Sequence, residues 1–200
     1  RPGAHEPRSP GAQEPRSPGA KGYRLRRTPP VTETRLMNQD LEELAAALGQ
    51  RLMQSGLMLA TAESCTGGWI AQVVTGVAGS SAWFDRGFVT YSNQAKEEML
   101  GVDGTTLAAH GAVSAPVVTA MATGALARSQ ARVAVAISGI AGPGGGGAER
   151  PVGTVFIAWA LDGQPPRVRR LQLPGDREAV RHQTVRIALE GLLELLGGGG

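Results

Sequence analysis

Residues 57–74 constrain the fold more than any other stretch, because they predict a strand, a tight turn and a helix in direct succession. The apolar run 57–60 is typical of a buried strand, and residues 69–74 favour a helix. Between them lies the polar, glycine-containing segment Thr61-Ala62-Glu63-Ser64-Cys65-Thr66-Gly67-Gly68. A strand that turns directly into a helix is a building unit of α/β domains.

The turn itself has the composition of an anion site. At a strand-to-helix junction, free backbone N–H groups and the positive end of the helix dipole favour an anion or a developing oxyanion. Gly67 and Gly68 would let another molecule approach the backbone closely. The spacing fits equally well with an ordinary turn whose Ser or Thr caps the helix. Both interpretations stay open at this point.

The rest of the chain repeats the alternation of strands and helices. We expect strands over residues 57–62, 84–91, 133–138, 152–161 and 167–173. We expect helices over residues 38–55, 67–75, 94–100 and 115–130 and from 176 onward, four of them beginning at the capping or starting residues Asn38, Asn93, Ser114 and Asp176. This order predicts a three-layer α/β/α sandwich with a mixed sheet, formed by residues 36–197.

The first 35 residues have a different composition. They contain seven of the thirteen prolines and a near-perfect repeat, residues 3–10 followed by 11–18. This composition predicts a disordered leader. Binding of a partner and a targeting role are both conceivable, but a functionally silent leader is the simpler interpretation, and Met37 is a candidate natural start.

Charge is distributed unevenly between the leader and the predicted domain. Residues 1–35 hold eight cationic and three acidic side chains, whereas the rest of the chain holds twelve cationic and fourteen acidic ones. The basic character of the sequence therefore belongs to the leader. A weakly acidic domain lacks the basic field that indicates a nucleic-acid partner.

The composition also excludes several classes of site. A single cysteine, Cys65, excludes an internal disulfide and a cysteine-cluster metal site. His110 and His182 and the scattered acids have no metal-ligand spacing, so we expect neither a metal nor a cofactor. No apolar run reaches membrane-spanning length and the start lacks the apolar centre of a secretion signal. We therefore expect a cytoplasmic protein that does not contact a membrane.

A glycine-rich loop, residues 139–147, follows the strand predicted at 133–138. Residues 142–147 fit the G-x-G-x-x-G pattern, but a dinucleotide site needs a helix to begin there, and here another strand follows. No phosphate-binding G-x-x-x-x-G-K-[ST] segment exists either. We interpret the segment as a mobile loop at the mouth of a site, with Gly142 and Gly144 as candidate substrate contacts.

Lysine usage points to one side chain. The chain contains eighteen Arg and two Lys, and Lys96 is the only lysine outside the leader. Arginine cannot release a proton near neutral pH, whereas a lysine with a lowered pKa can. Lys96 follows Tyr91-Ser92-Asn93, which suggests a Ser64 nucleophile with a Lys96 base beside Tyr91. Chance survival of one lysine is the alternative, and Cys65 is the rival nucleophile.

Arg177 occupies the first turn of the last predicted helix, where a cation opposes the helix dipole. A phosphate or carboxylate partner would explain this placement. An ordinary surface ion pair would explain it as well.

Taken together, the motifs resemble the C-terminal domain of the CinA (competence/damage-inducible) family over about residues 38–196. The segments that carry the resemblance are Ala62-Glu63-Ser64-Cys65-Thr66-Gly67-Gly68, Gly79-Ser80-Ser81-Ala82-Trp83-Phe84, Gly87-Phe88-Val89-Thr90-Tyr91-Ser92-Asn93 with Lys96, His110-Gly111-Ala112-Val113-Ser114, Ser138-Gly139-Ile140-Ala141-Gly142-Pro143 and Pro151-Val152-Gly153-Thr154-Val155.

The resemblance implies hydrolysis of the carboxamide of nicotinamide mononucleotide (NMN) to nicotinate mononucleotide and ammonia. It implies Ser64 as nucleophile, Lys96 as base with Tyr91 beside it, and Arg177 in the G-D-R segment. It also implies that Ser81 lies near the oxyanion. We further expect N–H groups near Thr66, Gly67 and Gly68 to hold that oxyanion together with Ser81. The alternative is a non-catalytic nucleotide-binding regulatory or competence-associated module. A homodimer is permitted by the small-residue helices.

Overall fold

The structure, a computed structural model, describes residues 31–197, with side chains described from residue 39 onward. The helices are α1 (Val31–Ser55), α2 (Trp69–Thr75), the short 3-10 helix η1 (Ser80–Ala82), α3 (Asn93–Leu100), α4 (Gly104–His110), α5 (Ala115–Ala127) and α6 (Arg177–Gly197). The strands are β1 (Leu59–Glu63), β2 (Phe84–Val89), β3 (Val133–Gly139), β4 (Thr154–Leu161) and β5 (Arg167–Gln172).

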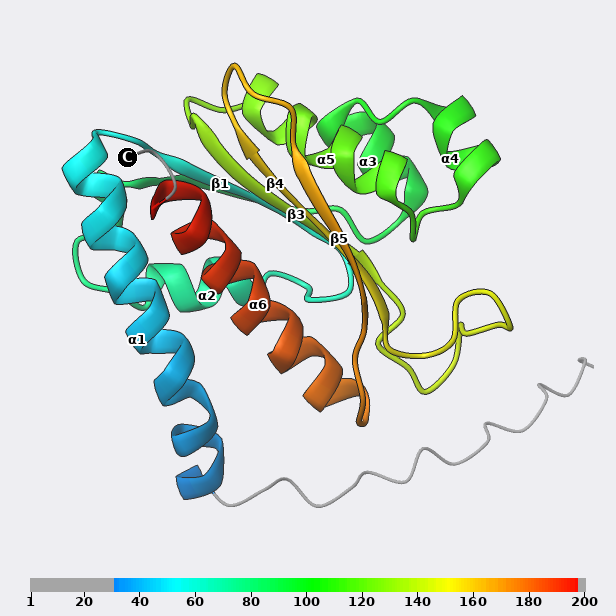
Figure 1. The fold of residues 1–200 in the computed structure, drawn as a ribbon, viewed down its shortest axis with the longest axis horizontal. Coiled ribbons are helices and arrows are strands. Elements are labelled where there is room, and N and C mark those ends of the chain that lie inside the picture. The colour runs from blue at the N-terminus through cyan, green and yellow to red at the C-terminus, as the bar shows by residue number, and fades with distance from the viewer. Residues whose placement is uncertain (1–30, 198–200) are drawn as a thin grey trace, which may run out of the picture.

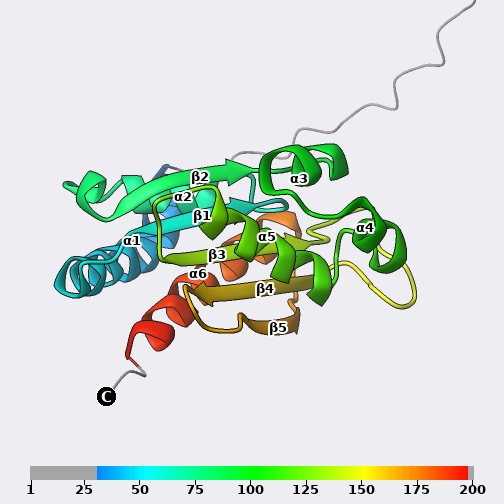
Figure 2. The same ribbon diagram turned by 90° about the horizontal axis from the view of Figure 1, so that it is seen from above.

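The five strands form one mixed sheet in the order β2-β1-β3-β4-β5 (Figure 2). β1 pairs in parallel with β2 and β3, and β4 runs antiparallel to both β3 and β5. Figure 1 shows α1, α2 and α6 on one face of the sheet and α3, α4 and α5 on the other. The predicted three-layer α/β/α sandwich with a mixed sheet is confirmed.

Each face of the sheet has its own hydrophobic core. Because side chains alternate along a strand, β3 sends Val133, Val135 and Ile137 to the core under α1, α2 and α6, and Ala134 and Ala136 to the core under α5. The central strands are buried on both faces, as expected for a sheet covered twice.

The structure corrects the prediction at two places. α1 begins at Val31, so Asn38 lies inside the helix instead of capping it, and the expected boundary at 35/36 falls within α1. Residues 1–30 of the predicted leader lie outside the described residues. The sequence analysis also missed α4, a seven-residue helix whose cap, Asp103, accepts a hydrogen bond from the N–H of Thr105 at 2.8 Å.

The topology brings several strand ends to one edge of the sheet. β1, β2 and β3 are parallel, and β5 runs in the same direction, so all four end at the edge where β4 begins. α6 also begins there, shortly after the end of β5. In open α/β sheets, ligands bind outside the carboxyl ends of the strands.

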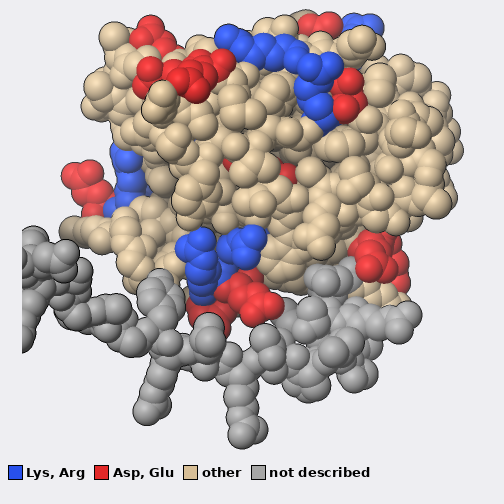
Figure 3. Space-filling view, turned by 180° about the vertical axis from the view of Figure 1, so that it is seen from behind, with Lys and Arg blue, Asp and Glu red and all other residues tan. Residues whose placement is uncertain are grey.

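Two surface properties follow for the described part of the chain. None of its helices combines the length and the apolar character that a membrane span needs. The face seen in Figure 3 carries Lys and Arg side chains in small groups, most of them next to Asp or Glu side chains. This face therefore offers no continuous basic stripe that could follow a nucleic-acid backbone.

Candidate active site

Ser64 is the first residue after β1, at the edge where the parallel strands end. Its N–H donates to the carbonyl oxygen of Ile137 on β3 at 3.1 Å, which holds it in line with the sheet. On the other side, the N–H of Thr90 donates to the carbonyl oxygen of Glu63 at 2.8 Å, so the chain after β2 also lies beside Ser64.

Lys96 reaches Ser64 from α3. Ser92 caps this helix by accepting a hydrogen bond from the N–H of Ala95 at 3.0 Å, and Lys96 lies one turn further on. Its side chain is 1% exposed. The Nζ atom lies 3.2 Å from Ser64 Oγ and donates to the carbonyl oxygen of Thr90 at 2.7 Å. Residues 32 positions apart in sequence thus form a buried hydroxyl–amine pair.

The surroundings of Lys96 favour the uncharged amine. Burial removes water from the ammonium and lowers the pKa of Lys96 from its ordinary value, an effect that a Coulombic interaction with Cys65 opposes only partly. None of the ion pairs formed by side chains of residues 39–197 includes Lys96. A neutral amine next to a hydroxyl is the state that general-base chemistry requires.

The thiol of Cys65 lies in a different environment from the hydroxyl of Ser64. Its side chain belongs to the hydrophobic core under α6 and is 6% exposed. Desolvation by burial raises the pKa of the Cys65 thiol to about 11, despite the nearby cations Arg181 and Arg177. Since the thiolate is the nucleophilic form, this environment disfavours the rival nucleophile.

Glu63 holds the turn between β1 and α2 in place. Its fully buried carboxylate accepts hydrogen bonds from the N–H groups of Gly68, Ile70 and Ala71 at 3.0, 3.1 and 2.9 Å. A buried carboxylate with three backbone donors holds the start of α2 in place of a capping side chain on Gly68. Glu63 thus occupies the anion position that the sequence suggested for a ligand.

This arrangement changes the expected set of oxyanion donors. The N–H of Gly68 is bound to Glu63, and the N–H of Gly67 donates to the carbonyl oxygen of Ser64 at 3.1 Å. The prediction that both glycine N–H groups hold the oxyanion is therefore corrected. Within residues 39–197, the N–H of Thr66 has no hydrogen-bond partner, and its buried hydroxyl is also unpartnered.

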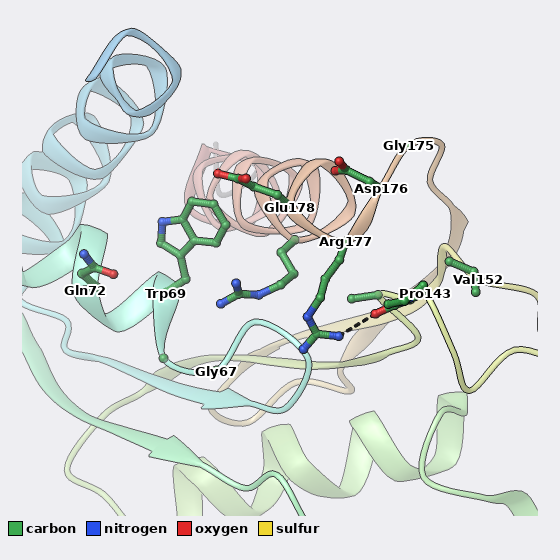
Figure 4. Close-up of a pocket in the computed structure, with 13 residues that line it drawn as sticks. Gly67, Trp69, Gln72, Pro143, Val152, Gly175, Asp176, Arg177 and Glu178 are labelled. Carbon is green, nitrogen blue, oxygen red and sulfur yellow. Dashed lines mark hydrogen bonds between the residues drawn. The ribbon is translucent and has the colours of Figure 1, made fainter. Parts of the chain in front are cut away.

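A pocket of about 850 Å³ opens beside this turn. Figure 4 shows α2, the start of α6 and the loop around Pro143 enclosing it. It is lined by Gly67, Gly68, Trp69, Gln72, Ala141, Gly142, Pro143, Val152, Gly175, Asp176, Arg177, Glu178 and Arg181. The glycine loop therefore contributes Gly142 to the wall, whereas Gly144 does not line the pocket.

Arg177 extends from the start of α6 across the pocket toward the loop before Pro143 (Figure 4). One terminal nitrogen donates to the carbonyl oxygen of Gly142 at 2.8 Å and the other to the hydroxyl of Tyr91 at 3.4 Å. In the part of the chain with described side chains, no ion pair includes Arg177. The ordinary surface ion pair is thus not the reason for its position.

Tyr91 and Ser81 are the two predicted site residues that do not join the pair of Ser64 and Lys96. Tyr91 is 65% exposed and its hydroxyl contacts Arg177, with no hydrogen bond to Ser64 or Lys96. Ser81 lies in η1, before β2, and the pairing of Phe84 with Leu59 puts it at the opposite end of the parallel strands. Five residues of strand separate the two ends by roughly 15 Å. Within one chain Ser81 thus lies at the far end of β1 from Ser64, and its position near the oxyanion stays a prediction.

The sequence analysis missed three contributors: Glu63, Trp69 and Arg181. Arg181 follows Arg177 by four residues, the spacing that puts two side chains on one helix face. Like charges at this spacing repel each other, so the pair of arginines was the available signal that this helix face has hydrogen-bond acceptors beside it. Nothing in the sequence ties Trp69 to the pocket. Within the described residues, no group of three His, Cys, Asp or Glu side chains could hold a metal ion.

Comparison with known proteins identifies the family of the chain. The family model of the CinA C-terminal domain matches residues 41–196. The chain belongs to the CinA C-terminal domain family. This CinA domain is 55% identical over 157 residues to nicotinamide-nucleotide amidohydrolase PncC of Escherichia coli (strain K12), across 78% of this chain and 95% of that protein.

Other relatives of the CinA domain agree. A protein of the same name from Pseudomonas putida is 55% identical over 152 residues, across 76% of this chain and 94% of that protein. The crystal structure of competence/damage inducible protein CihA from Agrobacterium tumefaciens superposes with a TM-score of 0.76 at 51% identity, covering 78% of this chain and 95% of that one. The family resemblance inferred from the motifs is confirmed.

Proposed function

We propose that this CinA domain is an amidohydrolase that converts NMN and water to nicotinate mononucleotide and ammonia through a Ser64 nucleophile and a Lys96 base. The observation that carries the proposal is the buried hydrogen bond between Lys96 Nζ and Ser64 Oγ. The 55% identity to the PncC protein of Escherichia coli across 95% of its length supports the amide substrate.

In this mechanism Ser64 Oγ attacks the carboxamide carbon while the neutral Lys96 amine takes the hydroxyl proton. The C–O bond forms, negative charge collects on the carbonyl oxygen, and the N–H of Thr66 is a free donor proposed to stabilise it. Lys96 then passes the proton to the amide nitrogen, the C–N bond breaks and ammonia leaves. Water, activated by the same amine, hydrolyses the ester and restores Ser64.

The rest of the nucleotide would occupy the pocket beside the turn. Arg177, which has no carboxylate partner among the described side chains, is the group proposed to meet the 5′-phosphate, with the backbone of Gly142 next to it. An arginine at the start of a helix adds charge-assisted hydrogen bonds to the dipole that already favours an anion.

The test is ammonia release from NMN, nicotinamide and glutamine by the purified protein and three variants. We expect release from NMN, a fall of about a thousandfold or more in Ser64→Ala, and a fall of about a hundredfold or more in Lys96→Ala. Cys65→Ala is the matched control and should remain active.

Two outcomes would contradict the proposal. Activity that survives in Ser64→Ala and disappears in Cys65→Ala would make the thiol the nucleophile. Binding of NMN by a folded wild-type protein that releases no ammonia from any of the three amides would favour the non-catalytic nucleotide-binding module.

A further inference from the structure

Arg181 contacts the nucleophile turn more extensively than any other side chain of α6. Its Nε donates to the carbonyl oxygen of Cys65 at 3.1 Å, and a terminal nitrogen donates to the carbonyl oxygen of Thr66 at 2.7 Å. Its guanidinium carbon also lies 5.1 Å from the centre of the Trp69 ring. One cation thus binds two consecutive carbonyl groups and the first residue of α2.

From these contacts we infer that Arg181 is a positioning residue, which holds the peptide unit between Cys65 and Thr66 so that the Thr66 N–H faces the reacting carbonyl oxygen. This inference rests on the proposed function and adds a residue to it.

The direction of the Thr66 N–H follows from peptide geometry. A trans peptide unit is planar, and its N–H points away from its carbonyl oxygen. Because Arg181 binds the Cys65 carbonyl from the α6 side, the Thr66 N–H of the same unit points to the other side of the turn. The N–H groups of Gly67 and Gly68 are already bound to Ser64 and Glu63. Among the N–H groups of residues 66–68, Thr66 therefore supplies the donor that remains.

A second connection runs from Arg181 to the nucleophile itself. The carbonyl oxygen of Thr66, which Arg181 binds, belongs to the peptide unit whose N–H is that of Gly67. That N–H donates to the carbonyl oxygen of Ser64 at 3.1 Å. Bonds in such a chain polarise and strengthen one another in a low-dielectric site. Loss of Arg181 would thus loosen the backbone of Ser64 as well as the donor.

The contacts distinguish this role from that of a phosphate ligand. In a turn with two neighbouring carbonyls, the planar fork of an arginine matches both oxygens at once, which a lysine cannot do. Two nitrogens of Arg181 already donate hydrogen bonds to these carbonyl oxygens. Arg177, by contrast, reaches across the pocket to a loop on its far side (Figure 4).

The test compares Arg181→Ala and Arg181→Lys with the matched control Arg186→Ala, a 44%-exposed arginine of the same helix that pairs with Glu190. With NMN as substrate, we expect kcat to fall by about tenfold to a hundredfold in both Arg181 variants, since loss of a whole oxyanion donor costs about a hundredfold or more. KM should change by less than about threefold, because the ground-state contacts with substrate remain. Added guanidinium chloride at millimolar concentration should restore part of kcat in Arg181→Ala only.

A rise in KM at unchanged kcat would overturn the inference and make Arg181 a substrate ligand. Unchanged kcat and KM would overturn it as well. If Arg181→Ala does not fold by circular dichroism, Arg181→Lys, which keeps the charge near Trp69, decides between these outcomes. A wild-type protein that releases no ammonia would instead refute the proposed function, and this inference with it.

Discussion

Lys96 illustrates how the position of one residue can lower the pKa of its side chain. Its aliphatic stem and amine are enclosed at the end of the sheet, where its nitrogen finds one carbonyl and one hydroxyl oxygen instead of a carboxylate. Such partners accept hydrogen bonds without offsetting the cost of a buried charge. These surroundings lower the pKa of the amine, as the proposed role of Lys96 as a base requires.

The pH dependence of catalysis should report this state. Because the pKa of Lys96 is lowered from 10.5, kcat/KM for NMN should rise with pH as the ammonium loses its proton and level off at a pH below 10.5. Lys96→Arg should lose about a hundredfold or more at every pH, since a guanidinium cannot accept the proton. The measurement is ammonia release as a function of pH.

The control for this profile is Cys65→Ala. The pKa of the Cys65 thiol is about 11, above the expected rise, so the profile should be the same without the thiol. A rising limb that vanishes in Cys65→Ala would assign the titration to the thiolate and contradict the role of Lys96.

Tyr91 offers a second test at this scale. Its hydroxyl is exposed, and its contact with Arg177 is 3.4 Å long, so Tyr91→Phe should reduce kcat/KM by less than about tenfold, the effect of one neutral hydrogen bond. Arg177→Ala should instead raise KM for NMN, because the 5′-phosphate would lose its proposed partner. Loss of kcat by a hundredfold in Tyr91→Phe would mean that the hydroxyl acts on the reacting atoms.

At the scale of elements, the junction between β1 and α2 depends on a charge that never meets solvent. α2 has only seven residues, too short to be stable by itself, and its first residues are bound by the Glu63 carboxylate. Glu63 precedes Ser64 directly. The same carboxylate therefore stabilises the helix and fixes the direction in which the chain leaves β1.

Glu63→Gln should destabilise the fold. The amide retains one acceptor oxygen and turns an N–H₂ group toward backbone donors, so at least one buried N–H is left unpaired, at a cost of about 1–3 kcal/mol. Urea unfolding should show a lower midpoint at an unchanged slope. Glu190→Gln, on the exposed side of α6, is the control and should change the free energy of unfolding by less than about 0.5 kcal/mol. Equal midpoints for the two variants would contradict the role assigned to Glu63.

The sequence predicted what depends on local pattern. The buried strands at 133–139 and 154–161 and the cap at Asp176 were found because periodicity and capping are properties of neighbouring residues. α4 was missed because its seven residues include a glycine and two β-branched threonines, which weaken any helical pattern.

The site was only partly predictable, for a related reason. Ser64 and Lys96 could be singled out by residue type and by the family motifs. Arg181 binds carbonyl groups 115 and 116 positions away in sequence, and no local pattern encodes that contact. Ser81 was assigned by resemblance alone, and the parallel pairing of β1 with β2 puts it at the other end of the sheet.

At the scale of the whole molecule, the fold assembles the site from elements that are far apart in the chain. The proposed nucleophile Ser64 follows β1, the proposed base Lys96 comes from α3, and both pocket arginines come from α6, with the sheet edge as the common point. Burying this amine lowers the free energy of unfolding of the whole domain. Stability should therefore depend on the protonation of Lys96.

The sign of this dependence follows from linkage. Between the lowered pKa of folded Lys96 and its ordinary value of 10.5, the unfolded chain binds more protons than the folded one, so the contribution of Lys96 to stability rises with pH across that window. Below this pH window Lys96 carries the ammonium in both the folded and the unfolded chain, and the folded state is destabilised by the full cost of burying that charge. Lys96→Met removes the titration while keeping an unbranched side chain of similar length.

The measurement is urea unfolding of wild type and Lys96→Met from about pH 6 to 10. The free energy of unfolding of wild type should increase relative to that of Lys96→Met as pH rises. Cys65 acts in the opposite direction, because its thiol titrates near 9.0 in the unfolded chain and at about 11 when folded, which lowers stability with rising pH above 9.0. Both proteins contain Cys65, so the part of its contribution that does not depend on the charge of Lys96 cancels in the difference. A difference that stays constant across this range would mean that Lys96 keeps its ordinary pKa in the fold, and the neutral amine required of the base would then be absent near neutral pH.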